Sequence, residues 1–279
     1  MEDKTLLLVD GNSLITASYF ALPELHTSGG VPTNALRGFV DTVCSLIEEY
    51  KPSHMLVAFD SMNNKRKQKH PDYKASRKPL DAELYEQYPY IEEFLELMNI
   101  SMRRKDGYEA DDIIASATVA FNQDIPIVIA TRDKDMFRLC CFKNVRIAYY
   151  GASGRLIDSG GVITMLGVTP EQVSFFKALS GDPSDNVKGV PGIGKVTAAK
   201  LLGEYGDLST IVKEAQADNI TPPRIGKLIR ENLQDLAKSY ELVQFLELPV
   251  TTRLSELTLD IPEDKAAMVE FFERMEFTI

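Results

Sequence analysis

Three short apolar runs alternate with amphipathic segments along the first half of the chain. Each run has the length and apolar content of a buried strand, and together they cover residues 5–10, 54–60 and 125–131. Apolar side chains recur at helical spacing in the intervening stretches, at residues 36–50, 84–98 and 111–121. Strands that alternate with helices predict an α/β fold with a central, mostly parallel sheet flanked by helices.

The last third of the chain has a different pattern. From about residue 167 it is mainly helical and is interrupted by several Gly and Pro residues. We therefore expect an α/β region over residues 1–166 and a helical region over residues 167–279. With 279 residues, 44% of them hydrophobic, the chain is long enough for a sizeable core. No stretch approaches the roughly 20 apolar residues that span a bilayer, so no membrane partner is expected.

Aspartate residues stand at the end of all three predicted strands. Asp10 and Asp60 end the first two, and the pair Asp133 and Asp135 follows the third. Ligands of open α/β sheets bind just beyond the carboxyl ends of the strands, where neighbouring strands would bring these carboxylates together. Each aspartate alone could simply cap the next helix, but three such coincidences favour a shared site.

Two further acidic groups extend this pattern. Glu109, Asp111 and Asp112 open a predicted helix, where favourable interaction with the helix dipole accounts for one or two acids but not for three. Asp182 and Asp185 lie in the segment SGDPSDN, which would be interpreted as a turn if it stood alone.

The nine carboxylates repel one another if they converge, so they require cations. Oxygen ligands suit Mg²⁺ or Mn²⁺, and neither an HExxH motif nor a paired Cys/His spacing indicates zinc. Two ions roughly 3.5–4 Å apart would stabilise both the attacking and the leaving oxygen of a phosphoryl displacement. The acids therefore predict a metal-dependent phosphodiester hydrolase.

A basic segment follows Asp60 directly. The net charge of −10 argues against a nucleic-acid partner, but residues 65–78 carry seven Lys and Arg residues against Asp72 alone. Such side chains make sequence-independent phosphate contacts, and Tyr73 could stack on a base. The alternative is a solvated, charged loop.

A Gly-rich turn, GVPGIG, begins at Gly189 and leads through Lys195 into a predicted helix that ends near residue 202. Small residues allow the backbone N–H groups at a helix start to approach a phosphate closely. The turn is neither a Walker loop nor a Rossmann fingerprint. The alternative is a plain turn between two helices.

Together these segments resemble the 5′-nuclease (flap endonuclease) family, which includes the N-terminal nuclease domain of bacterial DNA polymerase I and the phage-type flap endonucleases. The matching segments are LLLVDGNS, VAFDS, PDYKASR, GYEADDIIAS, IATRDKDMFRL and ALSGDPSDNVKGVPGIGKVTAAKLL. The resemblance implies a PIN-like sheet, a helical arch over about residues 65–88 and a helix-hairpin-helix over about residues 186–203.

The resemblance also assigns the metal ligands. The residues that would hold a first Mg²⁺ or Mn²⁺ ion are Asp10, Asp60, Glu109 and Asp111, with Asp112 close by. The residues that would build a second site are Asp133, Asp135, Asp182 and Asp185. In the arch, the residues that match phosphate-contacting positions are Arg66, Lys74 and Arg77, and Lys74 is counted with the catalytic residues. The residues that would hold the duplex backbone, with a monovalent ion such as K⁺, are Gly189, Gly192, Gly194 and Lys195.

One position departs from the family pattern. Family members usually carry an arginine seven residues after the first aspartate, where this chain has Ala17. That arginine helps to hold the substrate near the scissile phosphate, so its replacement predicts a changed substrate preference or rate.

The function that the resemblance implies is structure-selective 5′-3′ exonuclease and 5′-flap endonuclease activity on DNA, performed by a monomer. The three cysteines form no disulfide framework, which favours the reducing cytoplasm. One alternative is a PIN-like ribonuclease, which would be shorter and lack the Gly-rich turn and the basic segment. Another is a non-catalytic protein that binds branched DNA, against which the intact set of acids argues.

Overall fold

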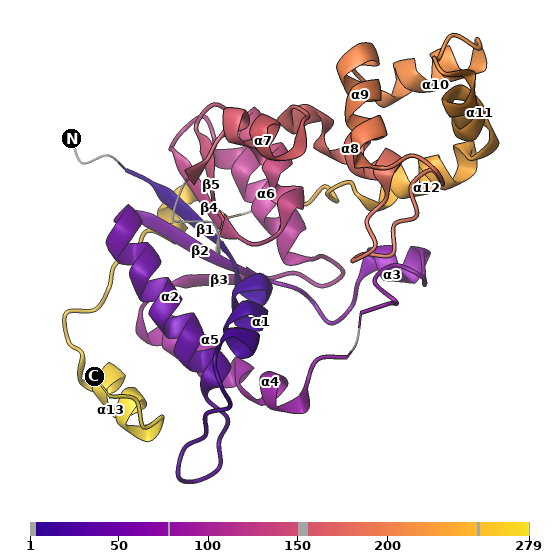
Figure 1. Ribbon diagram of the computed structural model, residues 1–279. Helices are drawn as coiled ribbons and strands as arrows, with labels where there is room; N and C mark the ends of the chain where they lie inside the picture. The colour runs from indigo at the N-terminus through magenta and orange to yellow at the C-terminus, as the bar shows by residue number, and fades with distance from the viewer. Residues whose placement is uncertain (1–3, 78, 150–155, 250–251, 279) are drawn as a thin grey trace.

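The computed structural model describes residues 4–77, 79–149, 156–249 and 252–278 (Figure 1). Within this part of the chain, one six-stranded sheet has the order β3-β2-β1-β4-β5-β6. Its strands are β1 (Leu6–Asp10), β2 (His54–Phe59), β3 (Ser101–Arg104), β4 (Ile127–Thr131), β5 (Val145–Tyr149) and β6 (Leu156–Ile157). All neighbouring strands run parallel except β6, which is antiparallel to β5. The predicted, mostly parallel sheet is confirmed.

The three predicted strands lie side by side at the centre of this sheet. Every residue of β1, β2 and β4 is buried, as expected for strands covered on both faces. In β1, Leu6 and Leu8 pack into one core while Leu7 and Val9 pack into another on the opposite face. Because β1 lies between β2 and β4 in parallel register, the carboxyl ends of all three strands meet at one edge.

Helices cover both faces of the sheet (Figure 1). The helices on one face are α1 (Gly11–Ala21), α2 (Asn34–Tyr50), α5 (Tyr88–Leu97) and α13 (Ala266–Arg274). Those on the other face or beyond it are α6 (Ala110–Phe121), α7 (Ser159–Leu166), α8 (Val173–Ser180), α9 (Lys195–Tyr205), α10 (Leu208–Gln216), α11 (Pro223–Glu231) and α12 (Leu233–Leu242). Short 3₁₀ helices are η1 (Lys134–Cys141), η2 (Pro170–Gln172) and η3 (Leu254–Leu257). Within the described residues, no helix is both long and apolar enough to cross a bilayer.

The helical region does not contain the whole of residues 167–279. Helices α8 to α12 gather at one end of the molecule, but the chain then returns to the sheet, where α13 packs against α5 (Figure 1). Phe271 of α13 is buried in the same core as Phe94 of α5. The last helix therefore belongs in space to the α/β layer.

The basic segment is less helical than the expected arch. Among the described residues between 65 and 87, the helices are only α3 (Lys65–Lys69) and α4 (Ala82–Glu86), and turns occupy residues 71–76 between them. Lys78 lies outside the described residues. Helix α3 ends at His70 because the following Pro71 disfavours helical backbone at the residue before it. The segment passes from below α12 to a position below α1, along one side of the molecule (Figure 1).

Two glycines of the helical region differ sharply in what surrounds them. Gly189 has a φ of +66°, and a Cβ there would lie 2.3 Å from the backbone nitrogen of Gly181. Gly203, inside α9, has open space within 4 Å of its Cβ position. We expect Gly189→Ala to lower the free energy of unfolding by at least about 2 kcal/mol, because the left-handed backbone and the close approach both exclude a side chain.

Gly203→Ala is the matched control and should leave stability unchanged or raise it by up to about 1 kcal/mol, because alanine favours helix. Urea titration of both variants measures the difference. Equal stabilities of the two variants would show that the backbones of Gly189 and Gly181 do not approach each other closely.

Candidate metal centre and nucleic-acid interface

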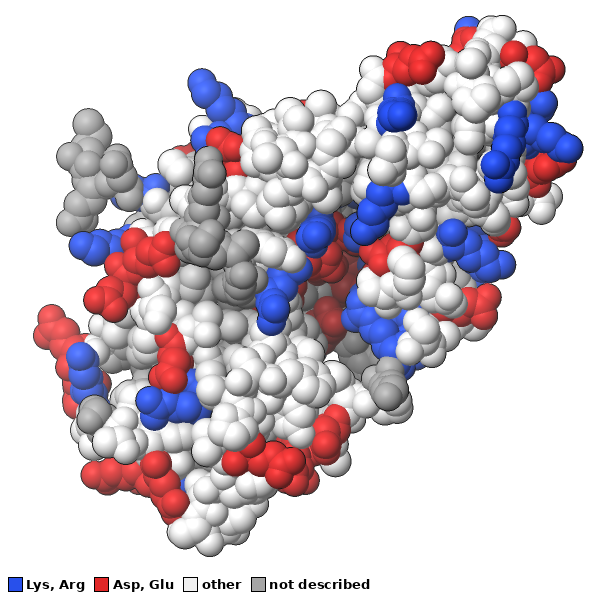
Figure 2. All heavy atoms as spheres, in the orientation of Figure 1, with Lys and Arg blue, Asp and Glu red and all other residues white. Residues whose placement is uncertain are grey.

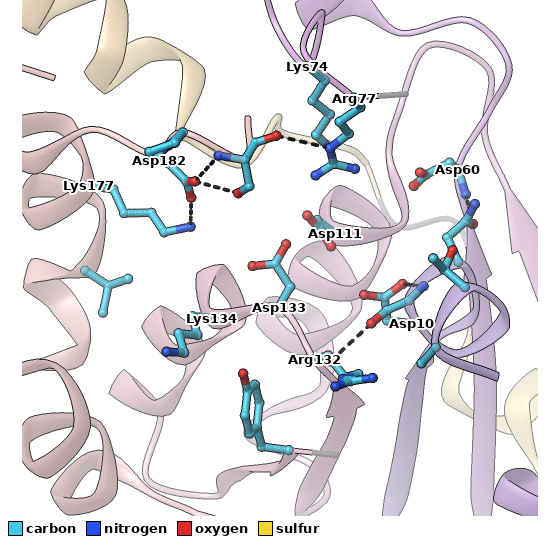
Figure 3. A pocket seen from close by; sticks show the side chains of 18 of the residues that line it. Asp10, Asp60, Lys74, Arg77, Asp111, Arg132, Asp133, Lys134, Lys177 and Asp182 are labelled. Atoms are coloured by element: carbon cyan, nitrogen blue, oxygen red, sulfur yellow. Dashed lines mark hydrogen bonds and ion pairs between the residues drawn. The ribbon is translucent and has the colours of Figure 1, made fainter. Parts of the chain in front are cut away.

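A cavity of about 1150 Å³ opens at the carboxyl edge of the sheet. Five of the nine acids named from the sequence line it: Asp10, Asp60, Asp111, Asp133 and Asp182. Figure 2 shows acidic side chains on the floor of this hollow and basic ones along its rim. In Figure 3 these acids come from separate elements and extend toward a common space. The convergence expected from the strand ends is therefore present for these five.

Asp10 occupies the junction of β1 and α1. Its carboxylate accepts hydrogen bonds from the Ser13 N–H (3.0 Å) and the Thr131 hydroxyl (2.9 Å), so it is both an N-cap and a link to β4. Burial is the main cause that raises its pKa to about 7, and repulsion by Asp60 and Asp133 adds to the shift. Asp10 therefore caps α1, as the alternative interpretation had it, and also lines the cavity with the other acids.

Asp60 and Asp111 complete the crowded floor of the cavity. Asp60 accepts a hydrogen bond from the Ala110 N–H (2.8 Å), which ties the end of β2 to the start of α6. Burial raises the pKa of Asp60. The pKa of Asp111 lies well above its ordinary value, first through burial and then through repulsion by Asp133 and Asp10. The fold therefore holds these carboxylates where their charged forms are disfavoured.

The nine acids fall into two groups by their partners. Among the described residues, ion pairs with Lys or Arg neutralise five of them: Glu109, Asp112, Asp135, Asp182 and Asp185. The other four acids form no such pair with any described residue, and they are Asp10, Asp60, Asp111 and Asp133. All four line the cavity.

Glu109, Asp112 and Arg66 form a buried cluster behind the cavity. The Arg66 guanidinium donates two hydrogen bonds to Asp112 (2.6 and 2.9 Å) and one to Glu109 (2.6 Å). The Asp112 carboxylate also accepts from the N–H groups of Glu109 (3.0 Å) and Leu246 (2.7 Å).

This cluster corrects two expectations. Arg66 is only 7% exposed, so it faces carboxylates and not a phosphate. Asp112 is completely buried and its oxygens are already bonded, so it stands behind the acids that line the cavity and not among them. Neither position could be inferred from the sequence, because a basic run gives no sign of which of its members turns inward.

Tyr73 and Lys74 also turn toward Glu109. Tyr73 is 5% exposed and its hydroxyl donates to Glu109 (3.2 Å), so the expectation that it stacks on a base is wrong for this conformation. Lys74 lines the cavity and makes an ion pair with Glu109. Burial alone would raise the pKa of Glu109, but Lys74 and Arg66 bring it below its ordinary value.

Basic side chains hold three of the four acids expected at the second site. Lys177 of α8 pairs with both Asp135 and Asp182, at 2.8 Å from the latter, and Arg77 pairs with Asp185 at 2.6 Å. Burial opposes ionisation of Asp182, but Lys177 lowers its pKa to about 2. Lys177 was not singled out from the sequence. Its only signal was its place five residues before Asp182, near the end of a helix.

The residues that could hold a metal are thus a set of oxygen donors. Among the described residues, no three acidic, His or Cys side chains are close enough together to surround one ion. The floor carboxylates nevertheless fit Mg²⁺ or Mn²⁺, because their ligand atoms are oxygens and because burial, with repulsion from neighbouring acids, raises their pKa values, a cost that a bound cation would offset.

The Gly-rich turn divides into a buried and an exposed part. Gly189 is buried and its N–H donates to the Ser239 hydroxyl (3.1 Å), so it serves packing and cannot face a phosphate. Gly192 and Gly194 are exposed, and Gly194 is the N-cap of α9 without a side-chain cap. Lys195 follows it and lines the cavity. The exposed part alone can approach a ligand.

Helix α1 forms the remaining wall of the cavity. Ala17 lies on this wall, together with Phe20, whose side chain sequence reasoning did not consider. Phe20 lies within α1, away from the face that carries the buried Leu14, Ile15 and Ser18, so no sequence pattern pointed to it.

Two family comparisons cover nearly the whole chain. The N-terminal resolvase-like domain of 5′-3′ exonucleases matches residues 5–167, and the C-terminal SAM fold of 5′-3′ exonucleases matches residues 168–265. A protein of Aquifex aeolicus named 5′-3′ exonuclease is 35% identical over 93% of this chain and 88% of its own length. DNA polymerase I of Caldicellulosiruptor bescii is 38% identical over 98% of this chain but only 32% of its own length. The chain thus spans about a third of the length of the polymerases that it matches.

Solved structures share the fold. The T5 D15 protein, co-crystallised with metal ions, has a TM-score of 0.71 at 21% identity and covers 86% of this chain and 89% of its own. The catalytic core of Rad2 in complex with a DNA substrate has a TM-score of 0.64 at 17% identity, over 98% of this chain and 88% of its own.

The raised pKa of Asp10 predicts a pH-dependent stability in metal-free buffer. Its pKa is about 7 in the folded chain and near 3.8 in the unfolded chain, so this group costs stability as the pH rises from about 4 to about 7. We expect Asp10→Asn to raise the free energy of unfolding at pH 8 by about 2 kcal/mol, because the amide keeps the cap without the charge.

The gain should shrink as the pH falls toward 4, where the folded-state carboxyl is protonated and, like the amide, carries no charge. Thermal melting in EDTA between pH 4.5 and 8 measures it. A change in stability that is the same at every pH would contradict the raised pKa of Asp10.

Proposed function

Because this chain belongs to the 5′-3′ exonuclease family, we propose that it cleaves DNA phosphodiester bonds near a free 5′ end or a 5′ flap with the help of two divalent metal ions. The observation that carries the proposal is a set of carboxylates on the floor of one cavity that form no ion pair with any described residue, below a rim that is basic. Carboxylates serve metal ions and cations serve phosphates, so one cavity contains both halves of a phosphodiesterase site.

The metal ligands in this proposal are led by the four unpaired acids. Asp10, Asp60 and Asp111 would hold the first ion, and Asp133 would face the second. Divalent ions, when bound, neutralise these charges and stabilise the charge that develops on the phosphoryl oxygens. The ions are Mg²⁺ or Mn²⁺, since both accept oxygen ligands.

The remaining acids take supporting positions. Glu109 is fixed by Arg66, Tyr73 and Lys74, so it would meet an ion at the edge of the first site. Asp182 and Asp135 share Lys177, and Asp185 is paired with Arg77, so they would join the second site when these cations turn to phosphates. Asp112 acts through Arg66 and is a positioning residue.

The phosphate contacts in the proposal come from the rim. The basic side chains that line the cavity are Lys74, Arg77, Arg132, Lys134, Lys177 and Lys195. Lys74 is placed both near the acids and in the cavity, so it would act on the phosphate next to the one that is cut. Such contacts do not read bases, and the enzyme would select DNA by shape and charge.

Helix α9 provides a second grip on the substrate. Gly192, Gly194 and Lys195 are exposed at its start, where backbone N–H groups favour a phosphate. This turn would hold the duplex backbone at the edge of the cavity, and a K⁺ ion is the expected companion of its carbonyl groups. The enzyme would act as a monomer, in the cytoplasm where DNA lies.

Asp133→Asn tests whether cleavage and DNA binding depend on different residues of this site. We expect the single-turnover rate on a labelled 5′-flap in Mg²⁺ to fall at least about a hundredfold, because a metal-binding charge is removed. DNA affinity should change less than threefold, about the size of a weak contact, because the phosphate grips are elsewhere.

Asp124→Asn is the matched control, since that aspartate is exposed and lies outside the cavity. It should cleave at the unaltered rate. An RNA flap run in parallel tests the ribonuclease alternative. The proposal fails if the Asp133 variant loses affinity and rate by the same factor, or if the unaltered chain cuts no flap in Mg²⁺.

A further inference from the structure

Phe20 is a large apolar side chain exposed beside a highly charged cavity. It is 72% exposed although it lines the cavity that the acids share. A single exposed apolar residue on a surface is ordinary, but one in the wall of a substrate cavity faces the substrate. Its position therefore requires an account beyond core packing.

The surroundings of Phe20 present an apolar surface on one side of the cavity. Ala17 lies one turn earlier on α1 and also lines the cavity. Pro79 and Leu80, which lie between α3 and α4, add apolar side chains to the lining. The ring of Tyr19 meets the ring of Phe20 edge to face, with centroids 5.3 Å apart and an interplanar angle of 86°. This packing orients the Phe20 ring and still leaves most of the side chain in solvent.

A nucleotide has the same two-sided character as this cavity. Its phosphate is charged and suits the basic rim, while its base is flat and suits an aromatic ring. We propose that Phe20 is a base-stacking residue, which holds one nucleobase of the bound DNA strand and so positions that strand for cleavage. This inference rests on the proposed function and adds a substrate-positioning contact to it.

The length of α1 limits which nucleotide is held. Phe20 lies ten residues after Asp10, the N-cap of α1, which corresponds to about 15 Å along the helix axis. Stacked bases are about 3.4 Å apart along one strand, so this distance equals roughly four base steps. The base on Phe20 should therefore belong to a nucleotide within about four positions of the scissile phosphate.

An abasic scan tests the contact at single-nucleotide resolution. Flap substrates would carry one abasic site at each position within four nucleotides of the cut, and the unaltered chain, Phe20→Ala and Phe20→Trp would be compared. On intact DNA, Phe20→Ala should slow single-turnover cleavage about tenfold, whereas Phe20→Trp should keep the rate. At one abasic position, the unaltered chain and Phe20→Ala should cleave equally, because the base that stacks is gone.

Binding supplies a readout that does not depend on cleavage. A flap with 2-aminopurine at the same position should lose fluorescence on binding to the unaltered chain and to Phe20→Trp, but not to Phe20→Ala. Met62→Ala is the control, because Met62 is fully exposed and lies outside the cavity.

The outcomes separate this inference from the proposed function. If the chain binds the flap and quenches 2-aminopurine but never cleaves, the nuclease proposal fails and the stacking contact stands. If it cleaves, and Phe20→Ala is either without effect or equally slow at every abasic position, the stacking contact is refuted and the nuclease proposal stands.

Discussion

Repulsion among buried carboxylates is the constraint on which the rest of this structure depends. Parallel strands β1, β2 and β4 end at one edge, and each delivers an aspartate there because the chain turns at once into the next element. The protein offsets the resulting charge with basic side chains for five acids and leaves four on the cavity floor without an ion pair in the described residues. That division separates the acids that ion pairs already neutralise from the four that we propose as metal ligands.

The buried cluster around Arg66 connects the paired acids to other parts of the fold. Arg66 joins the basic segment to the start of α6 through Asp112 and Glu109, and it also donates to the carbonyl of Gln244, just after α12 (2.7 Å). A buried arginine with four such bonds is costly to desolvate but still more costly to leave unpaired. Arg66 therefore couples the basic segment, the carboxyl edge of the sheet and the helical region at one point.

Much of the fold could be predicted from periodicity. The three apolar runs became adjacent central strands because only strands buried on both faces are apolar at every position. Strand β3, with the sequence SMRR, was missed because it is a partly exposed edge strand with no apolar run. Helix α1 was also missed, since its first residues are the polar ones that follow the strand-end aspartate.

The positions of the strand-end acids could be predicted from the sequence, whereas the side chains that contact the acids could not. Asp10 and Asp60 could be placed because a strand end fixes the position of the next side chain. The inward turns of Arg66 and Tyr73 depend on Glu109, which is far away in sequence, so local pattern contained no sign of them. Lys177 and Phe20 were unremarkable members of helices until the fold placed them beside the cavity.

The most direct test of the central claim is anomalous diffraction from crystals grown with Mn²⁺. The account predicts Mn²⁺ peaks inside the cavity, the strongest of them in contact with the carboxylates of Asp10, Asp60 or Asp111. Crystals that show the same fold, with these side chains in place and no Mn²⁺ bound among them at millimolar concentration, would contradict it.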